Sequence, residues 1–275
     1  MPIPLEDNFT DIIGKAQRGH DLTDEALAEK SGASVEAIQR LKAGEFDRAT
    51  SDLLAPVLEL DAPALATLAE GHWQPEDAAV EGLVQFTTDY GDMKVNAYLA
   101  WDPVCKMAIA FDTGASCAAM LEHAQREGLA IKLILLTHAH PDHVADLARL
   151  VEATGAPVFL ASEESAPGAE PMSEGATYEV GGLTVETLRT SGHSPGGMTF
   201  FIRGLDQPVA IVGDSLFAGS MGGGNVSYED AIRNNLEKIM TLPNDTILCP
   251  GHGPLTTVIE EKRHNAFFAG RVEEL

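Results

Sequence analysis

The chain has 275 residues, of which 44% are hydrophobic, and its formal net charge is −24 at pH 7. This length suits one large domain, or a medium-sized domain with a small one beside it. The strong negative charge argues against a general binder of nucleic acid or anionic membranes, because such proteins need a basic face. No stretch approaches the ~20 apolar residues of a membrane span.

The N-terminus and the cysteines bear on the cellular compartment. The opening residues, MPIPLEDNFTDII, have neither the basic region nor the apolar core of a secretory signal. The three cysteines, Cys105, Cys117 and Cys249, are odd in number and widely spaced, so they do not form a disulfide framework. A cytoplasmic location is therefore expected.

Residues 8–72 are predicted to form short helices. Thr23 is the expected N-cap of a helix that Gly32 ends, and Ser34 is the expected N-cap of a helix that ends at Gly44. This helix pair, joined by SGAS, resembles the helix-turn-helix of phage-repressor-type domains. We therefore expect a small helical, helix-turn-helix-like domain over residues 1–75 and a second domain over residues 76–275.

The charge of the helical segment argues against DNA binding. Residues 1–75 contain 14 acidic and 6 basic residues, a net charge of −8. The helix that would read DNA carries Arg40 and Lys42 but also Glu36, whereas such a helix normally lies in a positive field. A role in packing or dimerisation is favoured, with a homodimer through these helices as the expected assembly and no nucleic-acid partner.

From about residue 80 onward, short β-rich runs alternate with helical ones, which is typical of an α/β domain. The runs LILL and AIVG are uniformly apolar, as expected of strands that are buried on both faces. The segment from Ala161 to Ala176 is rich in Ser, Glu, Pro and Gly, and it is predicted to be an exposed, mobile flap.

A dense group of possible metal ligands follows the predicted strand IKLILL. Loops at the carboxyl ends of buried strands are where α/β proteins place ligand-binding and catalytic groups. Imidazole and carboxylate groups are ligands for zinc and iron. Four potential ligands lie too close together in the sequence, within six residues, to surround one tetrahedral ion, and they suggest two metals: His138, His140, Asp142 and His143.

Three further candidates each follow a β-like run: His193 in TSGHSPGG, Asp214 in AIVGDSLF and His252 in ILCPGHGP. A carboxylate such as Asp214 can bridge two cations, whereas a histidine cannot. Seven ligands give each of two ions three private ligands and one shared ligand. A bridging hydroxide would then complete both coordination shells and act as the nucleophile.

The motifs THAHPDH, SGHSPGG, GDSLF and CPGHG resemble, in order and spacing, those of the metallo-β-lactamase-fold hydrolases. The resemblance covers about residues 80 to 270 and implies an αββα sandwich with metals in a groove at one edge. Asp112 in FDTG is similar to a family aspartate that supports the metal ligands. GDSLFAGSMGG and the C-terminal motif are most similar to the glyoxalase II branch, which hydrolyses glutathione thioesters.

The resemblance also implies roles for the seven residues. His138, His140 and His193 would hold the first ion, Asp142, His143 and His252 the second, and Asp214 would bridge them. That branch usually carries an arginine after GSMG, and Gly223 stands there in this chain. The branch's C-terminal helical domain, which contacts glutathione, has no counterpart before Leu275.

The resulting hypothesis is a binuclear-metal hydrolase that acts on a small-molecule thioester, activated ester or lactone. Two cations would lower the pKa of a shared water and polarise the carbonyl, with Asp142 and Asp214 as the catalytic carboxylates. Zinc is favoured, and iron and manganese are alternatives. A persulfide dioxygenase with one iron on His138, His193 and Asp214 is the first rival function. A ligand-sensing DNA-binding regulator is the second.

Overall fold

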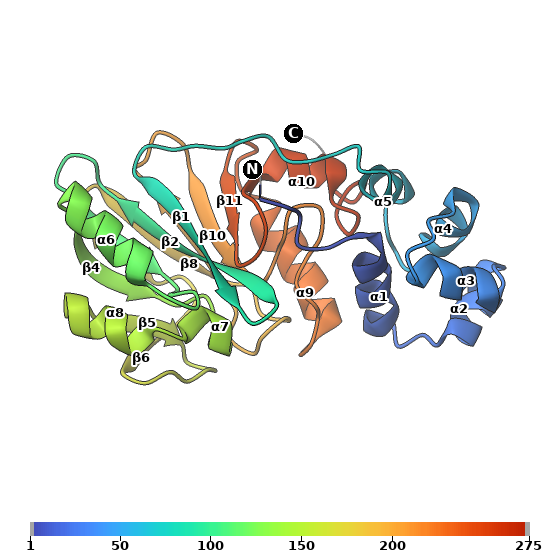
Figure 1. The fold of residues 1–275 in the computed structure, drawn as a ribbon, viewed down its shortest axis with the longest axis horizontal. Coiled ribbons are helices and arrows are strands. Elements are labelled where there is room, and N and C mark those ends of the chain that lie inside the picture. The colour runs from blue at the N-terminus through green and yellow to red at the C-terminus, as the bar shows by residue number, and fades with distance from the viewer. Residues whose placement is uncertain (1–2, 273–275) are drawn as a thin grey trace.

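The computed structural model describes residues 3–272. Two six-stranded sheets face each other, and helices cover their outer faces (Figure 1). This arrangement confirms the predicted αββα sandwich. Within the described range, no helix is long and apolar enough to cross a membrane.

The first sheet has the strand order β1-β2-β3-β4-β5-β6. Strands β1 to β3 are antiparallel neighbours, and β3 to β6 run parallel to one another. Its strands are β1 (Leu83–Tyr90), β2 (Met93–Trp101), β3 (Met107–Phe111), β4 (Ala130–Leu135), β5 (Val158–Ala161) and β6 (Ala169–Met172).

The second sheet has the order β12-β11-β10-β9-β8-β7. All its neighbours are antiparallel except β10 and β11, which run parallel. Its strands are β7 (Thr177–Val180), β8 (Leu183–Arg189), β9 (Met198–Arg203), β10 (Val209–Gly213), β11 (Ile247–Pro250) and β12 (Thr256–Thr257).

Alternate residues of the central strands face two different apolar layers. In β3, Ile109 and Phe111 face the second sheet, whereas Ala108 and Ala110 face the outer helices. Both faces of the strand are therefore buried, which explains why it reads as a continuous apolar run. Cys249 lies fully buried between the sheets, as a packing residue would.

Helices close the outer face of each sheet. Helices α6 (Ala118–Glu127) and α8 (Leu147–Thr154) pack on the first sheet through one apolar cluster. Helices α9 (Tyr228–Asn234), continued by a π-helical turn, and α10 (Val258–His264) pack on the second sheet through another.

Five helices precede the first strand. Thr23 caps α2 and Ser34 caps α3 by accepting backbone hydrogen bonds, and Gly32 ends α2 in the left-handed conformation, as predicted. The next helix begins at Arg48, after Asp47, whose side chain caps it by accepting from the backbone N–H of Thr50. The five are α1 (Phe9–Gly19), α2 (Asp24–Ser31), α3 (Val35–Lys42), α4 (Arg48–Leu54) and α5 (Ala62–Ala69).

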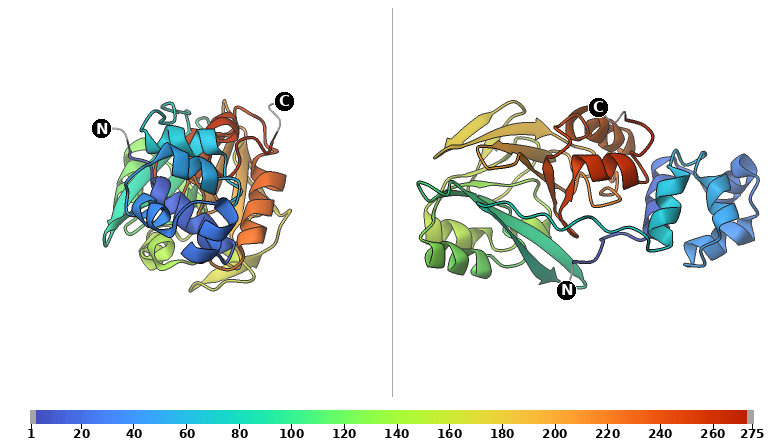
Figure 2. Two further views of the ribbon diagram at one scale, coloured as in Figure 1. Left: turned by 90° about the vertical axis from the view of Figure 1, so that its right-hand side faces the viewer. Right: turned by 90° about the horizontal axis from the view of Figure 1, so that it is seen from above.

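These helices lie at one end of the molecule, next to α9 and α10 (Figures 1 and 2). They share a continuous apolar cluster with the outer face of the second sheet, in which Ile12 and Ile13 join Leu216 and Met221. The division into domains at residue 75 and the helix-turn-helix likeness of α2 and α3 stay predictions.

The prediction of an exposed, mobile flap between Ala161 and Ala176 is partly wrong. Its middle, β6, forms a parallel edge strand on β5, with Ala161 paired to Met172. The composition gave no β signal there, because an edge strand needs only one neighbour and tolerates polar residues and proline.

Candidate metal centre

The loop that carries the first four candidate ligands begins where β4 ends. Strands β3 and β4 are parallel, so their carboxyl ends meet at the same edge of the sheet. There, the backbone N–H of Thr137 donates to Asp112 Oδ1 over 2.8 Å, and its hydroxyl donates to Asp112 Oδ2 over 2.7 Å. Asp112 therefore fixes the start of the ligand loop.

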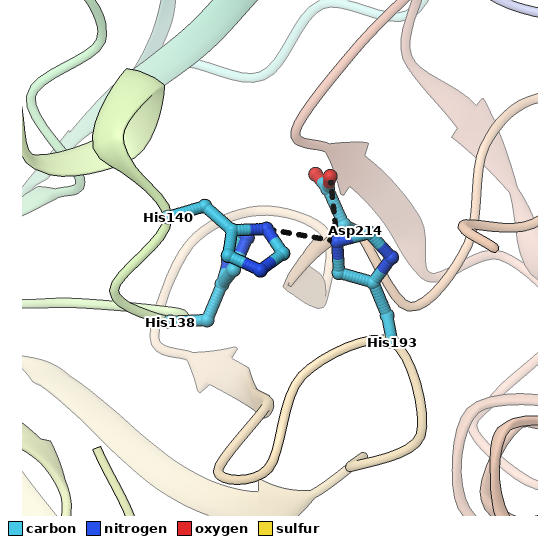
Figure 3. Close-up of side chains that lie close together, drawn as sticks. All are labelled: His138, His140, His193 and Asp214. Atoms are coloured by element: carbon cyan, nitrogen blue, oxygen red, sulfur yellow. Dashed lines mark hydrogen bonds and ion pairs between the residues drawn. The ribbon is translucent and has the colours of Figure 1, made fainter. Parts of the chain in front are cut away.

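Four of the candidate residues form a first cluster: His138, His140, His193 and Asp214, each of which offers one ligand atom within 4.8 Å of the others. Figure 3 shows the His140 and His193 rings turned toward each other, beside the Asp214 carboxylate. His193 Nε2 lies 3.0 Å from His140 Nδ1 and 3.3 Å from Asp214 Oδ2. Loops from both sheets thus converge on one point.

The other three candidates, Asp142, His143 and His252, form a second cluster within the same 4.8 Å limit. A short helix, α7 (Pro141–Val144), begins within the ligand loop, with proline as its first residue. Its first turn places Asp142 Oδ2 3.4 Å from His252 Nε2 and 3.6 Å from His143 Nε2.

Asp214 lies between the two clusters. Its Oδ1 is 3.2 Å from His143 Nε2, and its Oδ2 is 3.3 Å from His193 Nε2 and 3.4 Å from His252 Nε2. Asp214 follows Gly213, the last residue of β10. A Cβ added to Gly213 would lie 2.7 Å from the Thr137 side chain. The close approach of these two strand ends brings Asp214 to the ligand loop.

Three histidines are oriented by the ring nitrogen that faces away from the site. His143 Nδ1 lies 2.8 Å from Asp112 Oδ2 and donates to that carboxylate. His193 Nδ1 donates to the Gly223 carbonyl over 3.0 Å, and His252 Nδ1 donates to the Lys94 carbonyl. Such contacts fix the tautomer so that each Nε2 lone pair points inward, as in protein metal sites.

The residues present fit a metal group. Three buried atoms at the centre of the site have no hydrogen-bond partner: His138 Nε2, His143 Nε2 and Asp214 Oδ1. Unsatisfied buried polar atoms are rare and costly in folded proteins. Imidazole nitrogens and a carboxylate that converge without donors between them are the donor set that zinc and similar divalent ions take.

The electrostatics of the cluster favour bound positive charge. Burial disfavours the protonated form of His143, but Asp214 and Asp112 outweigh that effect and raise its pKa to about 10. Burial likewise disfavours ionised Asp214, but His143 and His252 hold its pKa well below the ordinary value. Divalent cations would replace these protons and compensate the same carboxylates.

One supporting residue was missed by the sequence analysis. Glu164, in the segment predicted to be a mobile flap, accepts hydrogen bonds from the backbone N–H of Ala139 and from that of Gly196, the latter over 2.9 Å. It thus ties the loop of His138 and His140 to the loop of His193. Nothing in the sequence distinguished this carboxylate from its acidic neighbours.

Several known proteins are similar to this chain. "Probable metallo-hydrolase YqgX" of Bacillus subtilis is 33% identical over 207 residues, which span 66% of this chain and 95% of that protein. "Hydroxyacylglutathione hydrolase GloC" of Haemophilus influenzae is 30% identical over 62% of this chain and 92% of its own. The solved structure of TTHA1623 in a di-iron-bound form is 32% identical, with a TM-score of 0.54, and covers 66% of this chain and 99% of that one.

A family model also matches the part of the chain that carries the site. The model of the metallo-beta-lactamase superfamily matches residues 90–252, more than half of the chain and a span that includes all seven candidate ligands. The N-terminal helices lie outside this span. The chain is therefore a member of the metallo-β-lactamase superfamily, whose homologues indicate a metal-dependent hydrolase.

Proposed function

We propose that the protein is a hydrolase with two divalent metal ions that cleaves a thioester or a related activated ester or lactone. The observation that carries this proposal is the position of Asp214. Its two oxygens lie 3.2–3.4 Å from ligand nitrogens of both clusters, so one carboxylate serves both. A single-metal site could use Asp214 as one of its ligands, but it would not need the second cluster of Asp142, His143 and His252 beside it.

In this proposal His138, His140 and His193 hold one ion, and Asp142, His143 and His252 hold the other. The two sets are the histidines of the first cluster and the three residues of the second. Asp214, a member of the first cluster, also lies 3.2 Å from His143 and 3.4 Å from His252 of the second. The di-iron form of TTHA1623 supports two metals on this fold. Zinc is the favoured metal, since histidine and carboxylate suit it, and iron is the alternative.

Bound ions of this kind lower the pKa of a shared water to near 7 and polarise a substrate carbonyl. The chain supplies the rest. Asp142 and Asp214 are both buried at the centre of the site, where their carboxylates can orient the attacking water. Among the described residues, the free cysteines Cys117 and Cys249 are buried, and burial raises the pKa of Cys117 to about 12, which argues against a thiolate nucleophile.

The thioester assignment rests on chemistry and on one relative. A thiolate leaves readily and needs little acid assistance. This suits the site, because the carboxylates at its centre, Asp142 and Asp214, are already assigned as metal ligands. GloC, the relative from Haemophilus influenzae, is named as a hydroxyacylglutathione hydrolase. We also propose that residues 1–75 form a helical domain attached to a hydrolase domain over residues 76–275.

The test combines metal analysis with a substrate panel. We expect two metal ions per chain and turnover of thioesters or lactones at the same rate with and without oxygen. One iron per chain, with oxygen uptake on a persulfide and no thioester turnover, would establish the dioxygenase alternative instead. DNA retention that weakens with salt would favour the regulator.

Asp214→Ala should remove metal and lower kcat/KM by at least about 100-fold. Substituting residues that only support metal ligands already lowers metal affinity or activity by about 10–100-fold. Asp206→Ala is the matched control, since Asp206 is exposed at the opposite end of β10. Full activity and full metal content in Asp214→Ala would refute the shared-ligand assignment.

A further inference from the structure

The loop from Ser215 to Gly223 connects β10 to α9, and both of its ends meet the metal centre. Asp214 precedes it, and the carbonyl of Gly223 accepts from His193 Nδ1 over 3.0 Å. At Gly222, an added Cβ would lie 1.9 Å from the Asp214 carbonyl oxygen and 3.0 Å from His193 Nδ1. The conformation of this loop therefore sets the relative position of Asp214 and His193.

Two residues from the start of the chain hold this loop. Asp7 Oδ2 accepts from Ser220 Oγ over 2.6 Å and forms an ion pair with Lys15 of α1. The ammonium of Lys15 also donates to the Met221 carbonyl over 2.8 Å. The two side chains are 8% and 13% exposed, respectively, so the pair is largely removed from water.

Lys15 also reaches the second cluster through an aromatic ring. Its Nζ lies 4.9 Å from the centroid of the Phe217 ring. That ring packs edge-on against His252, with centroids 5.5 Å apart. The N-terminal arm runs beside the same ligand, because an added Cβ at Gly253 would lie 3.2 Å from the Glu6 nitrogen.

Residues of α10 and its C-terminal end hold the loop from the opposite side. Glu261, fully buried, accepts from the backbone N–H of Gly219 over 3.0 Å. Asn265 donates to the Ser220 carbonyl and to Glu261, each over 2.7 Å. The turn between Phe217 and Ser220 is thus fixed from both sides.

A buried ion pair is a poor means of stabilising a fold, because the desolvation cost offsets the attraction between the charges. It does impose one geometry, since removing either partner leaves an unpaired buried charge. We propose that Lys15 and Asp7 are positioning residues for the metal centre, which makes α1 part of the catalytic unit. They hold the loop that places Asp214, His193 and, through Phe217, His252.

This inference rests on the proposed metal function, and its test reads metal binding directly. The variant is Lys15→Met, which keeps the length and apolar stem of the side chain but removes the charge. The control is Lys42→Met, which breaks the Lys42–Asp24 ion pair in the same helical segment, away from the loop. For both variants, the zinc dissociation constant is measured by chelator competition, together with the visible spectrum of the cobalt-substituted protein.

We expect Lys15→Met to bind zinc at least about 10-fold more weakly, as for residues that orient metal ligands, and to shift the cobalt spectrum. Its kcat should fall more than its KM changes, and Lys42→Met should match the wild type in each measurement. Zinc affinity within twofold of the wild type, with an unchanged cobalt spectrum, would overturn the inference. If the wild-type protein itself binds no metal, the proposed function fails instead.

A second variant covers the case in which Lys15→Met does not fold. Ser220→Ala removes the hydroxyl that donates to Asp7 and leaves the ion pair in place. Weaker zinc binding in Ser220→Ala, with an unchanged melting temperature, supports the inference. Wild-type zinc affinity in Ser220→Ala would then reject it.

Discussion

The candidate metal centre lies where loops from both sheets meet, and the N-terminal helices pack beside the outer face of the second sheet. Different interactions hold these two regions in place. The centre is a buried polar assembly whose key atoms, such as His138 Nε2, lack protein partners. The helices attach through apolar side chains, including the fully buried Ile12 and Ile13. The first arrangement costs stability and fixes geometry for function, whereas the second supplies stability.

The largest effect should come from a single added methyl group at the centre. In Gly222→Ala, the new Cβ would overlap the Asp214 carbonyl oxygen at 1.9 Å, so the loop must move away from both Asp214 and His193. We expect kcat/KM to fall at least about 100-fold, with loss of metal measured by elemental analysis.

Gly182→Ala is the control, in the turn between β7 and β8, at the opposite end of β8 from His193. Its Cβ would meet only the side chain of Asp102, at 3.2 Å, and that side chain can move aside. Activity within a few-fold of the wild type is expected there. Equal losses in the Gly222 and Gly182 variants would mean that the contact with Asp214 is not what matters.

The apolar contact between α1 and α9 can be disturbed by a substitution that does not contact the candidate metal ligands. In Gly19→Ala, the Cβ would lie 2.3 Å from the Tyr228 ring, where α1 meets α9. Overpacking of this kind should lower the free energy of unfolding by about 1–3 kcal/mol, measured by urea denaturation. Residual folded protein should keep its metal.

Gly14→Ala lies in the same helix and should act in the opposite direction. Its Cβ would meet only the flexible end of Arg18 at 3.2 Å, and alanine favours a helix interior by roughly 0.5–1 kcal/mol over glycine. A loss of stability in Gly14→Ala similar to that in Gly19→Ala would show that α1, rather than its contact with Tyr228, is sensitive.

A pH-dependent effect on stability should separate the buried polar groups from the apolar contacts. Burial raises the pKa of Glu261 to about 8 from its ordinary 4.5, despite the hydrogen bonds from Asn265 and Thr256. Because the folded pKa is the higher one, the stability linked to this proton is present below pH 4.5 and is lost as the pH rises toward 8.

Glu261→Gln should therefore gain stability relative to the wild type between pH 5 and pH 8, by about 1–3 kcal/mol at most. Urea denaturation of both proteins at several pH values measures this difference. The difference in the free energy of unfolding should be flat above pH 9. A difference that does not vary with pH would mean that Glu261 is ionised in the folded protein throughout this range.

Local patterns account for most of what the sequence predicted. The caps Thr23 and Ser34 and the apolar runs LILL and AIVG depend on neighbouring residues, so their signals lie in a few consecutive positions. The signal for the ligand loop also lies in consecutive positions, because its histidines and Asp142 follow one strand. The convergence of the distant ligands was predicted because each candidate follows a β-like run, and strand ends meet at sheet edges.

The residues that were missed act through long-range contacts. Lys15 reaches Met221 across 206 positions, and Glu164 reaches Gly196 across 32. One lysine among 18 basic residues and one glutamate among 42 acidic residues carry no mark of such a role in the sequence. Their importance follows only from the packing of the helices and loops, which residue periodicity does not determine.

The contacts of Glu261 and Asn265 with the loop after β10 also have a consequence for biosynthesis. The ribosome makes all seven candidate ligands before it makes Glu261 and Asn265. A nascent chain that already presents all seven candidate ligands still lacks the contacts that Glu261 and Asn265 make with the loop after β10. Metal capture with the mature geometry must therefore wait for these late residues to leave the exit tunnel and dock.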